Sequence, residues 1–284
     1  MVNAAGLGYA LGAMVCYGLS DIVYKRAATA GAKPHHMLMV QAWVFAPAIM
    51  VYALATGTLH LVAAAGWGAA AGFCLFFGLL NFSRSLRDGV VSVNAPIFRL
   101  NFTLTVALAV IVLDEPLGAV KIAGLVLSLL AVWLLLGGKV PGQAAISRDS
   151  LARVLFASVA FGIANFFYKL GVMSGVTPAT LVAAQAAVFF PLATATGYLT
   201  EKKLNVPAAV LPYGTAAALL LLTAFLLLAT SLVHGEASVL VPVAQMGFVI
   251  TAAAGILLLG ERTSARRVTG LAVAAAALIC LALS

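Results

Sequence analysis

Ten long apolar runs dominate this sequence and restrict it to folds that a lipid bilayer can hold. Of the 284 residues, 64% are hydrophobic and 8% are charged, whereas a soluble domain carries about 25% charged residues. A helix needs about 20 apolar residues to cross the hydrocarbon core. The runs therefore predict ten membrane-spanning helices, near residues 4–24, 35–55, 62–84, 90–113, 117–137, 151–171, 178–199, 210–232, 237–259 and 265–283.

The distribution of charged and metal-binding residue types excludes several classes of function. The net charge of +8 does not indicate nucleic-acid binding, because the basic residues stand in small groups between apolar runs. The cysteines Cys16, Cys74 and Cys280 lack the spacing of a metal site. The neighbours His35 and His36 lack the spacing of about four residues that a metal pair on one helix face needs. We therefore expect no metal, no other cofactor and no nucleic-acid partner.

The longest polar break, residues 137–153, separates two similar halves. The matched positions are glycines, prolines, amides, aromatics and acids. A shift of 144 positions aligns Gly18 with Gly162, Tyr24 with Tyr168, Gln41 with Gln185 and Pro47 with Pro191, and a shift of 146 aligns Pro96 with Pro242, Phe102 with Phe248, Glu115 with Glu261 and Gly124 with Gly270. This order indicates a duplication, with units over 1–138 and 151–284 and a linker over 139–150.

Each unit contains five predicted spans, and this odd number determines how the two units are related. The second unit must enter the membrane from the side opposite to the first. The units then form an inverted repeat, which is a common basis for alternating access. The predicted fold class is therefore an all-α integral membrane protein with ten transmembrane helices, arranged as two inverted five-helix repeats.

Short motifs recur at matching places in the two units. The first unit contains Ser92-Val93-x-x-Pro96 and Leu113-Asp114-Glu115-Pro116 with Gly124, and the second contains Ser238-Val239-x-x-Pro242 and Leu259-Gly260-Glu261-Arg262 with Gly270. This set resembles the EamA-type family of the drug/metabolite transporter superfamily over essentially the whole chain, although Asp-Glu-Pro departs from the typical Gly-Glu-Arg. The resemblance implies a ten-helix fold with a central cavity and transport, often outward, of metabolites, amino acids or drugs.

Basic residues predict which side of the membrane each connection faces. The odd-numbered connections hold nearly all Lys and Arg residues, and the even-numbered ones hold only Lys121 and Lys169. The positive-inside rule then places the odd-numbered connections in the cytoplasm and both termini outside. The family resemblance implies the reverse orientation. We favour the charge pattern, because it is a property of this chain.

Arg99 is the charged residue that lies deepest in a predicted span. A guanidinium at that depth must face a cavity or pair with an acid. We predict that it binds a substrate carboxylate or another anion; the alternative is a structural ion pair with Asp21. Its counterpart Gln245 keeps hydrogen bonding without the charge. Asp21 is the candidate for proton coupling, although a nearby arginine would make it a poor proton carrier.

Further polar and aromatic residues complete the predicted site. Gln41 and Gln185 either line the cavity or join helices by hydrogen bonds. Gln245, the counterpart of Arg99, is a further substrate-binding candidate. The remaining candidates are Tyr17, Trp43, Asn94, Phe98, Asn101 and Asn165. Lys169, at the end of the sixth span, is expected to extend to the membrane interface.

Four prolines lie inside predicted spans and predict helix kinks. Proline removes a helix hydrogen bond and bends the chain. The prolines form two matched pairs, which favours a shared mechanical role; they are Pro47 with Pro191 and Pro96 with Pro242.

Together these features predict a secondary transporter that exports a small polar metabolite, such as an amino acid, by alternating access. The expected partners are a small-molecule substrate and the lipid bilayer, and the expected location is a bacterial inner membrane. The sequence leaves open whether transport is coupled to protons and whether the protein is a monomer or a homodimer. One alternative is a flippase for a lipid-linked substrate, which would need a lateral opening between helices. The more distant alternative is an intramembrane enzyme, but clustered carboxylates, histidine pairs or a nucleophile with its base are not evident, so no catalytic residue is assigned.

Overall fold

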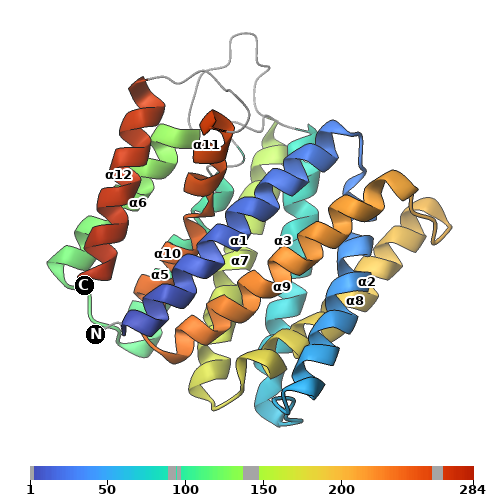
Figure 1. Ribbon diagram of the computed structural model, residues 1–284, viewed down its shortest axis with the longest axis horizontal. Coiled ribbons are helices and arrows are strands. Elements are labelled where there is room, and N and C mark those ends of the chain that lie inside the picture. Colours follow the sequence, from blue (N-terminus) through green and yellow to red (C-terminus); the bar gives the residue numbers. More distant parts are fainter. Residues whose placement is uncertain (1–2, 89–93, 95–96, 137–146, 258–264) are drawn as a thin grey trace.

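The protein is a bundle of helices, seen in a computed structural model that describes residues 3–88, 94, 97–136, 147–257 and 265–284. All regular secondary structure in these residues is helical (Figure 1). The first half forms α1 (Ala4–Thr29), α2 (Pro34–Ala55), α3 (Gly66–Asp88), α5 (Asn101–Leu113) and α6 (Ala119–Leu136). The second half forms α7 (Arg148–Met173), α8 (Pro178–Glu201), α9 (Leu211–Val233), α10 (Ala237–Gln245), α11 (Gly247–Leu257) and α12 (Ala265–Ala282). Short 3₁₀ turns, η1 (Ala63–Ala65) and η2 (Ala208–Val210), precede α3 and α9.

The helix lengths agree with a chain that crosses a membrane repeatedly. Eight helical segments among the described residues are long and apolar enough to span a bilayer. Two shorter apolar helices, Ile97–Leu113 and Ala119–Leu135, lie where the fourth and fifth spans are predicted. Both chain termini lie at the same end of the bundle (Figure 1), as an even number of crossings requires. The all-helical prediction is confirmed, and a count of ten spans depends on including the two shorter helices.

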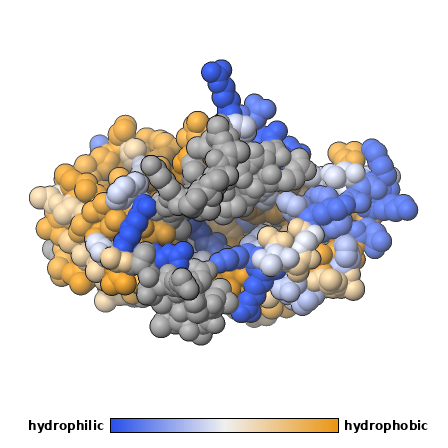
Figure 2. All heavy atoms as spheres, turned by 90° about the horizontal axis from the view of Figure 1, so that it is seen from above, coloured by the Kyte–Doolittle hydropathy of each residue, from blue (hydrophilic) through white to orange (hydrophobic). Residues whose placement is uncertain are grey.

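Large apolar side chains cover the outward faces of the helices. Val51, Ile111 and Trp133 are each more than half exposed. Such surfaces suit a lipid environment, because lipid tails form no hydrogen bonds and an apolar side chain among them therefore breaks none. Seen from the end opposite to the termini, hydrophilic side chains gather over the α8–α9 side and hydrophobic ones over the α6–α12 side (Figure 2).

The two halves pack through helix pairs that recur when the halves are exchanged. The first helix of one half contacts the third helix of the other, as α1 with α9 and α3 with α7. Equivalent helices of the two halves also pack on each other, as α2 with α8 and α6 with α12 (Figure 1). Contacts that repeat in this reciprocal way are those that a two-fold relation produces.

Two glycines at matched positions allow further close contacts between the halves, of α1 with α11 and of α7 with α5. A Cβ on Gly18 would lie 2.5 Å from a carbonyl oxygen of α11, and one on Gly162 would lie 2.7 Å from a carbonyl oxygen of α5. The Thr251 hydroxyl donates to the Gly18 carbonyl at 3.1 Å. The Thr105 hydroxyl donates to the Gly162 carbonyl at 3.0 Å. Thr105 and Thr251 are themselves 146 positions apart, so the same contact occurs in both directions between the halves.

The fourth and ninth spans are interrupted at the same place. The Leu100 N–H bonds to the carbonyl three residues earlier at 3.1 Å, and the Met246 N–H does the same at 3.2 Å. These tight turns separate residues 97–99 from α5 and α10 from α11. The ninth span, predicted as one helix over 237–259, is therefore two helices, because the backbone changes its hydrogen-bonding pattern at this turn.

The predicted kink prolines lie in different settings. Pro47 and Pro191 lie inside α2 and α8, and both helices continue past them. Pro242 lies inside α10, so the break at Met246 comes four residues after it. Pro96 lies outside the described residues.

Candidate functional site

The two helix breaks are flanked by residues that the sequence singles out. Arg99 precedes the turn at Leu100 and Asn101 follows it, while Gln245 precedes the turn at Met246. Asn101 and Gln245 are buried. Backbone groups at such a break leave the regular helix ladder and become available to a ligand, as in the interrupted helices of many transporters.

Arg99 forms an ion pair with Asp21 on α1. The two side chains are 12% and 31% exposed, so the pair lies neither in a sealed core nor on an open surface. The ion pair with Asp21, which the sequence suggested as the alternative to anion binding by Arg99, is therefore present. A guanidinium carries five N–H donors, and Arg99 keeps donors for a second anionic group beside Asp21.

Two buried polar atoms of the predicted site residues on α1 and α7 lack a hydrogen-bond partner among the described residues. They are Tyr17 Oη and Asn165 Oδ1. Tyr17 lies close enough to Arg99 to interact with it electrostatically, and Asn165 Nδ2 makes a long, 3.5 Å hydrogen bond to Asn101 Oδ1. Buried polar atoms nearly always have partners, so these atoms indicate where a water molecule or a ligand binds.

Gln41 and Gln185 are each held by a tyrosine of the preceding helix. Tyr24 Oη donates to Gln41 Oε1, and Tyr168 Oη donates to Gln185 Oε1. The helix-joining role considered for these amides is thus present in both halves. Each amide NH₂ group has two donor hydrogens of its own, so the tyrosine bond does not exclude a contact with substrate.

Three other predicted site residues are engaged in helix packing. Asn94 donates to a serine carbonyl of α3 at 2.7 Å and to a serine hydroxyl of α7 at 2.8 Å. Phe98 stacks on Phe82, with ring centroids 4.0 Å apart. Trp43 lies on the outer surface and donates to the Thr194 hydroxyl at 3.0 Å. We therefore leave these three residues out of the site that we assemble around Arg99.

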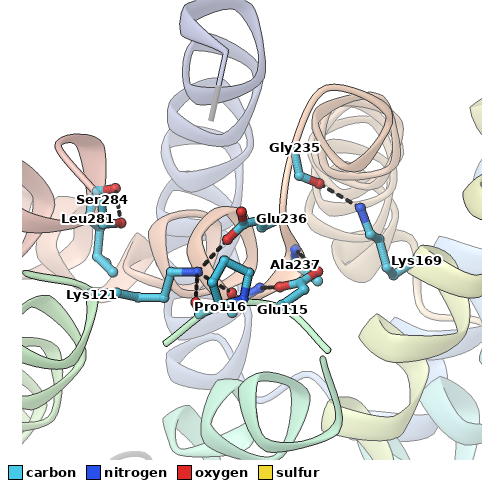
Figure 3. Close-up of polar contacts among 10 residues, drawn as sticks. Glu115, Pro116, Lys121, Lys169, Gly235, Glu236, Ala237, Leu281 and Ser284 are labelled. Carbon is cyan, nitrogen blue, oxygen red and sulfur yellow. Dashed lines mark hydrogen bonds and ion pairs between the residues drawn. The ribbon is translucent and has the colours of Figure 1, made fainter. Parts of the chain in front are cut away.

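A buried acidic residue at the end of the bundle that holds the termini was not recognised as a helix cap from the sequence (Figure 3). The Glu115 carboxylate accepts hydrogen bonds from the backbone N–H groups of Ala237 and Ser238, both at 2.8 Å. These donors open α10 and have no partner within the helix. Glu115 therefore caps a helix of the other half, and its charge also suits the positive end of the helix dipole.

Two lysines extend this network (Figure 3). Lys121 pairs with Glu236 and donates to the Pro116 carbonyl at 2.6 Å. Lys169 donates to the Gly235 carbonyl at 2.6 Å and does not simply extend to the interface as expected. The reason is that carbonyls at and beyond the end of α9 lack helical donors, and an ammonium group satisfies them. Glu115, Lys121, Lys169 and Glu236 are named the terminal-end network below.

Comparison with known proteins agrees with this architecture. A solved crystal structure of a protein superposes with a TM-score of 0.79 at 15% sequence identity, covering 99% of this chain and 97% of that chain. At this identity, the similarity shows the fold alone. No curated protein sequence matches the chain.

The first half of the chain also matches a family of membrane transporters. Residues 4–137 match the EamA-like transporter family. This match, together with the apolar helices, makes the chain an integral, multi-pass membrane protein. Over residues 4–137, the chain is similar to the EamA-like transporter family, which is part of the drug/metabolite transporter superfamily.

Proposed function

We propose that this protein is a secondary transporter that moves a small zwitterionic metabolite, such as an amino acid, by alternating access. The observation that carries the proposal is the pair of matched helix breaks at Leu100 and Met246, the first of which adjoins the Arg99–Asp21 ion pair. Interrupted helices of this kind form substrate sites in several transporter folds.

The charges at the first break suit a substrate that carries both signs. The Arg99 guanidinium can donate to a carboxylate, and the Asp21 carboxylate can accept from an ammonium group. An amino acid carries both groups on one carbon atom, so it binds between the two side chains without leaving either charge unpaired. Tyr17, which interacts electrostatically with Arg99, and Asn165, which contacts Asn101, supply unpartnered polar atoms for further contacts.

Alternating access requires halves that exchange conformations. In this proposal, the units 1–138 and 151–284 are inverted repeats, which the reciprocal contacts of Gly18 and Gly162 support. The terminal-end network joins the two halves, because Glu115 and Lys121 of the first contact residues 236–238 of the second. Opening the bundle at this end requires these contacts to break.

Charge distribution supports one orientation in the membrane. The connections opposite to the termini hold most of the basic residues of the chain, and the positive-inside rule places them in the cytoplasm. We therefore propose external termini in a bacterial inner membrane. Export is the direction that the family resemblance favours.

Asp21 is also the residue that the sequence offers for proton coupling. Because Arg99 engages its carboxylate, a proton would have to break this ion pair to bind. We therefore assign Asp21 to substrate binding. Any proton-coupled step would be an exchange in which a proton or the substrate replaces the Arg99 guanidinium at the Asp21 carboxylate.

Transport by the purified protein in liposomes tests this function. A thermal-shift screen against amino acids, nucleosides, sugars and quaternary amines identifies a ligand, because a ligand of the native state stabilises it. Exchange of the labelled ligand across the liposome membrane then measures transport. We expect Arg99→Ala and Asp21→Asn each to lower the exchange rate at least about tenfold, since hydrogen bonds to charged groups contribute about 1.5–3 kcal/mol.

Arg84→Ala is the matched control, because Arg84 is exposed at the end of α3, and it should exchange at the wild-type rate. Wild-type exchange by a correctly inserted Arg99→Ala variant would refute the site. Failure of the wild-type protein to exchange any ligand that raises its melting temperature would refute the transporter assignment itself.

A further inference from the structure

A second polar cluster lies where α2 begins and α8 ends, at the end of the bundle away from the termini (Figure 1). Its centre is Oε1 of Glu201, the last residue of α8. His35 Nε2 lies 2.9 Å from this oxygen, His36 Nε2 lies 3.7 Å from it, and Lys33 Nζ lies 2.7 Å from it. The two imidazoles thus direct the same ring nitrogen toward one carboxylate oxygen.

His36 is the residue that an ion pair alone does not explain. Its side chain is 7% exposed, and its Nε2 atom has no hydrogen-bond partner among the described residues. Leaving such a buried nitrogen unsatisfied costs about 1–3 kcal/mol. An imidazole nitrogen that faces another imidazole and a carboxylate is, however, well placed to bind a metal ion.

We propose that His35, His36 and Glu201 bind one divalent transition-metal ion of the Zn²⁺ type. Two imidazole nitrogens and one carboxylate oxygen are a common zinc ligand set, with bonds of about 2.0–2.2 Å. Tetrahedral bonds of this length separate the ligand atoms by about 3.3 Å. The observed separations of 2.9 and 3.7 Å from Glu201 Oε1 lie on either side of that value, and all three ligand atoms lie within 4.8 Å of one another.

Access to the site and its fourth ligand come from an adjoining cavity. This cavity has a volume of about 450 Å³ and is lined by residues that include His36, Glu201 and Asn205. A space of this size admits a hydrated ion and leaves room for a water molecule as the fourth ligand. The spacing of His35 and His36 led us to expect no metal. The sequence could not reveal the third ligand, because Glu201 lies on a helix of the other half.

Lys33 competes with the metal for Glu201. Its ammonium group neutralises the carboxylate, but its side chain is 59% exposed and can turn into water when a cation binds. The metal must therefore displace this ammonium group. Removing the lysine charge should increase metal affinity, whereas a cluster that only joins α2 to α8 would bind no metal with or without Lys33.

A bound ion would link α2 of the first half to α8 of the second. If the protein transports by alternating access, as proposed above, the ion would hold this end of the bundle together and inhibit transport. Metal binding to the purified protein does not depend on that function, so the two proposals can fail separately.

Titration of the full chain, purified in detergent without a histidine tag, tests the site. Zn²⁺ binding is measured by calorimetry, and Co²⁺ binding by the visible absorption of the tetrahedral ion. We expect one ion per chain, at least about tenfold weaker binding in His36→Gln and in Glu201→Gln, and tighter binding in Lys33→Gln. His60→Gln and His234→Gln are matched controls, since these histidines lie outside the cluster, and they should bind like the wild type.

The comparison of variants also separates binding from misfolding. His36→Gln and Glu201→Gln must keep the metal-free melting behaviour of the wild type, and Lys33→Gln tests the site by a gain that no unfolded protein would show. Absence of stoichiometric binding by both the wild type and Lys33→Gln would overturn the proposal. Binding that His36→Gln leaves unchanged would overturn it as well.

Discussion

The Arg99 guanidinium pairs with the Asp21 carboxylate, and this contact joins the broken fourth span to α1. The repeat places Gln245 and Asn165 at the equivalent positions of the second half, and neither residue carries a charge. The pair therefore gives the two breaks different electrostatic properties although their backbones match.

Removing one member of this pair should destabilise the protein more than removing both. A single Arg99→Met or Asp21→Leu substitution leaves one charge without its partner, which costs roughly 3–5 kcal/mol in a fully buried pair. Partial exposure reduces the expected loss to about 1–3 kcal/mol, and the double variant should recover part of it. Reversible unfolding in mixed detergent micelles measures the cycle, and strictly additive losses would contradict an interaction between the two residues.

Glycine substitutions should have opposite effects at two positions of α1. Gly18→Ala places a Cβ 2.5 Å from a carbonyl oxygen of α11, so the helices must move apart and stability falls. Gly8→Ala meets nothing within 4 Å, and alanine stabilises a helix interior by about 0.5–1 kcal/mol relative to glycine. Melting temperatures of the two variants in detergent should therefore change with opposite signs; equal effects would mean that α1 and α11 are not in close contact.

The two tyrosine–glutamine bonds should differ in strength. Tyr168→Phe removes a donor from the buried Gln185, and we expect a loss of about 1–2 kcal/mol because an amide oxygen is left unsatisfied. Tyr24→Phe acts at a partly buried site and should cost less, because water can replace the lost donor. Unfolding free energies rank the variants, with the exposed Tyr198→Phe as an unaffected control. A larger loss in Tyr24→Phe would reverse the expected order.

Glu115 should hold the two halves together by capping α10. Glu115→Ala removes the acceptor of two backbone N–H groups and should cost about 1–2 kcal/mol, the value of a strong helix cap. Glu115→Gln keeps a neutral oxygen acceptor and should cost less. In a cysteine-free background, Gly235→Cys should react faster with a membrane-impermeant maleimide when Glu115 is alanine. Asp149→Ala, which removes an exposed acid at the start of α7, should leave that reaction rate unchanged.

The apolar runs predicted most of the helices with small errors at their ends. The predicted spans 35–55 and 178–199 correspond to α2 and α8. α1 continues past its predicted end at residue 24 to Thr29, because the long side chains of Lys25 and Arg26 reach water without ending the helix. The breaks at Leu100 and Met246 were missed, since both residues are apolar and nothing in their side chains marks a turn.

The site was predictable to the extent that single residues reveal their environment. Arg99 was recognisable because a guanidinium within an apolar run needs a partner, and Asp21 was considered as that partner. The cap formed by Glu115 was not, because Ala237 lies 122 positions along the chain and sequence spacing contains no information about contacts between helices so far apart. The packing roles of Asn94, Phe98 and Trp43 were hidden for the same reason.

The difference between Arg99 and Gln245 has a consequence for the energetics of a working cycle. If the two halves exchange conformations when the carrier opens to the other compartment, the pseudo-two-fold axis does not convert one state into the other, because Arg99 and Asp21 form an ion pair while their counterparts Gln245 and Asn165 are uncharged. The two resting states then differ in free energy even when the compartments are identical. The empty carrier would therefore open preferentially toward one compartment. The cause would be the single arginine that the other half lacks, and not a concentration gradient across the membrane.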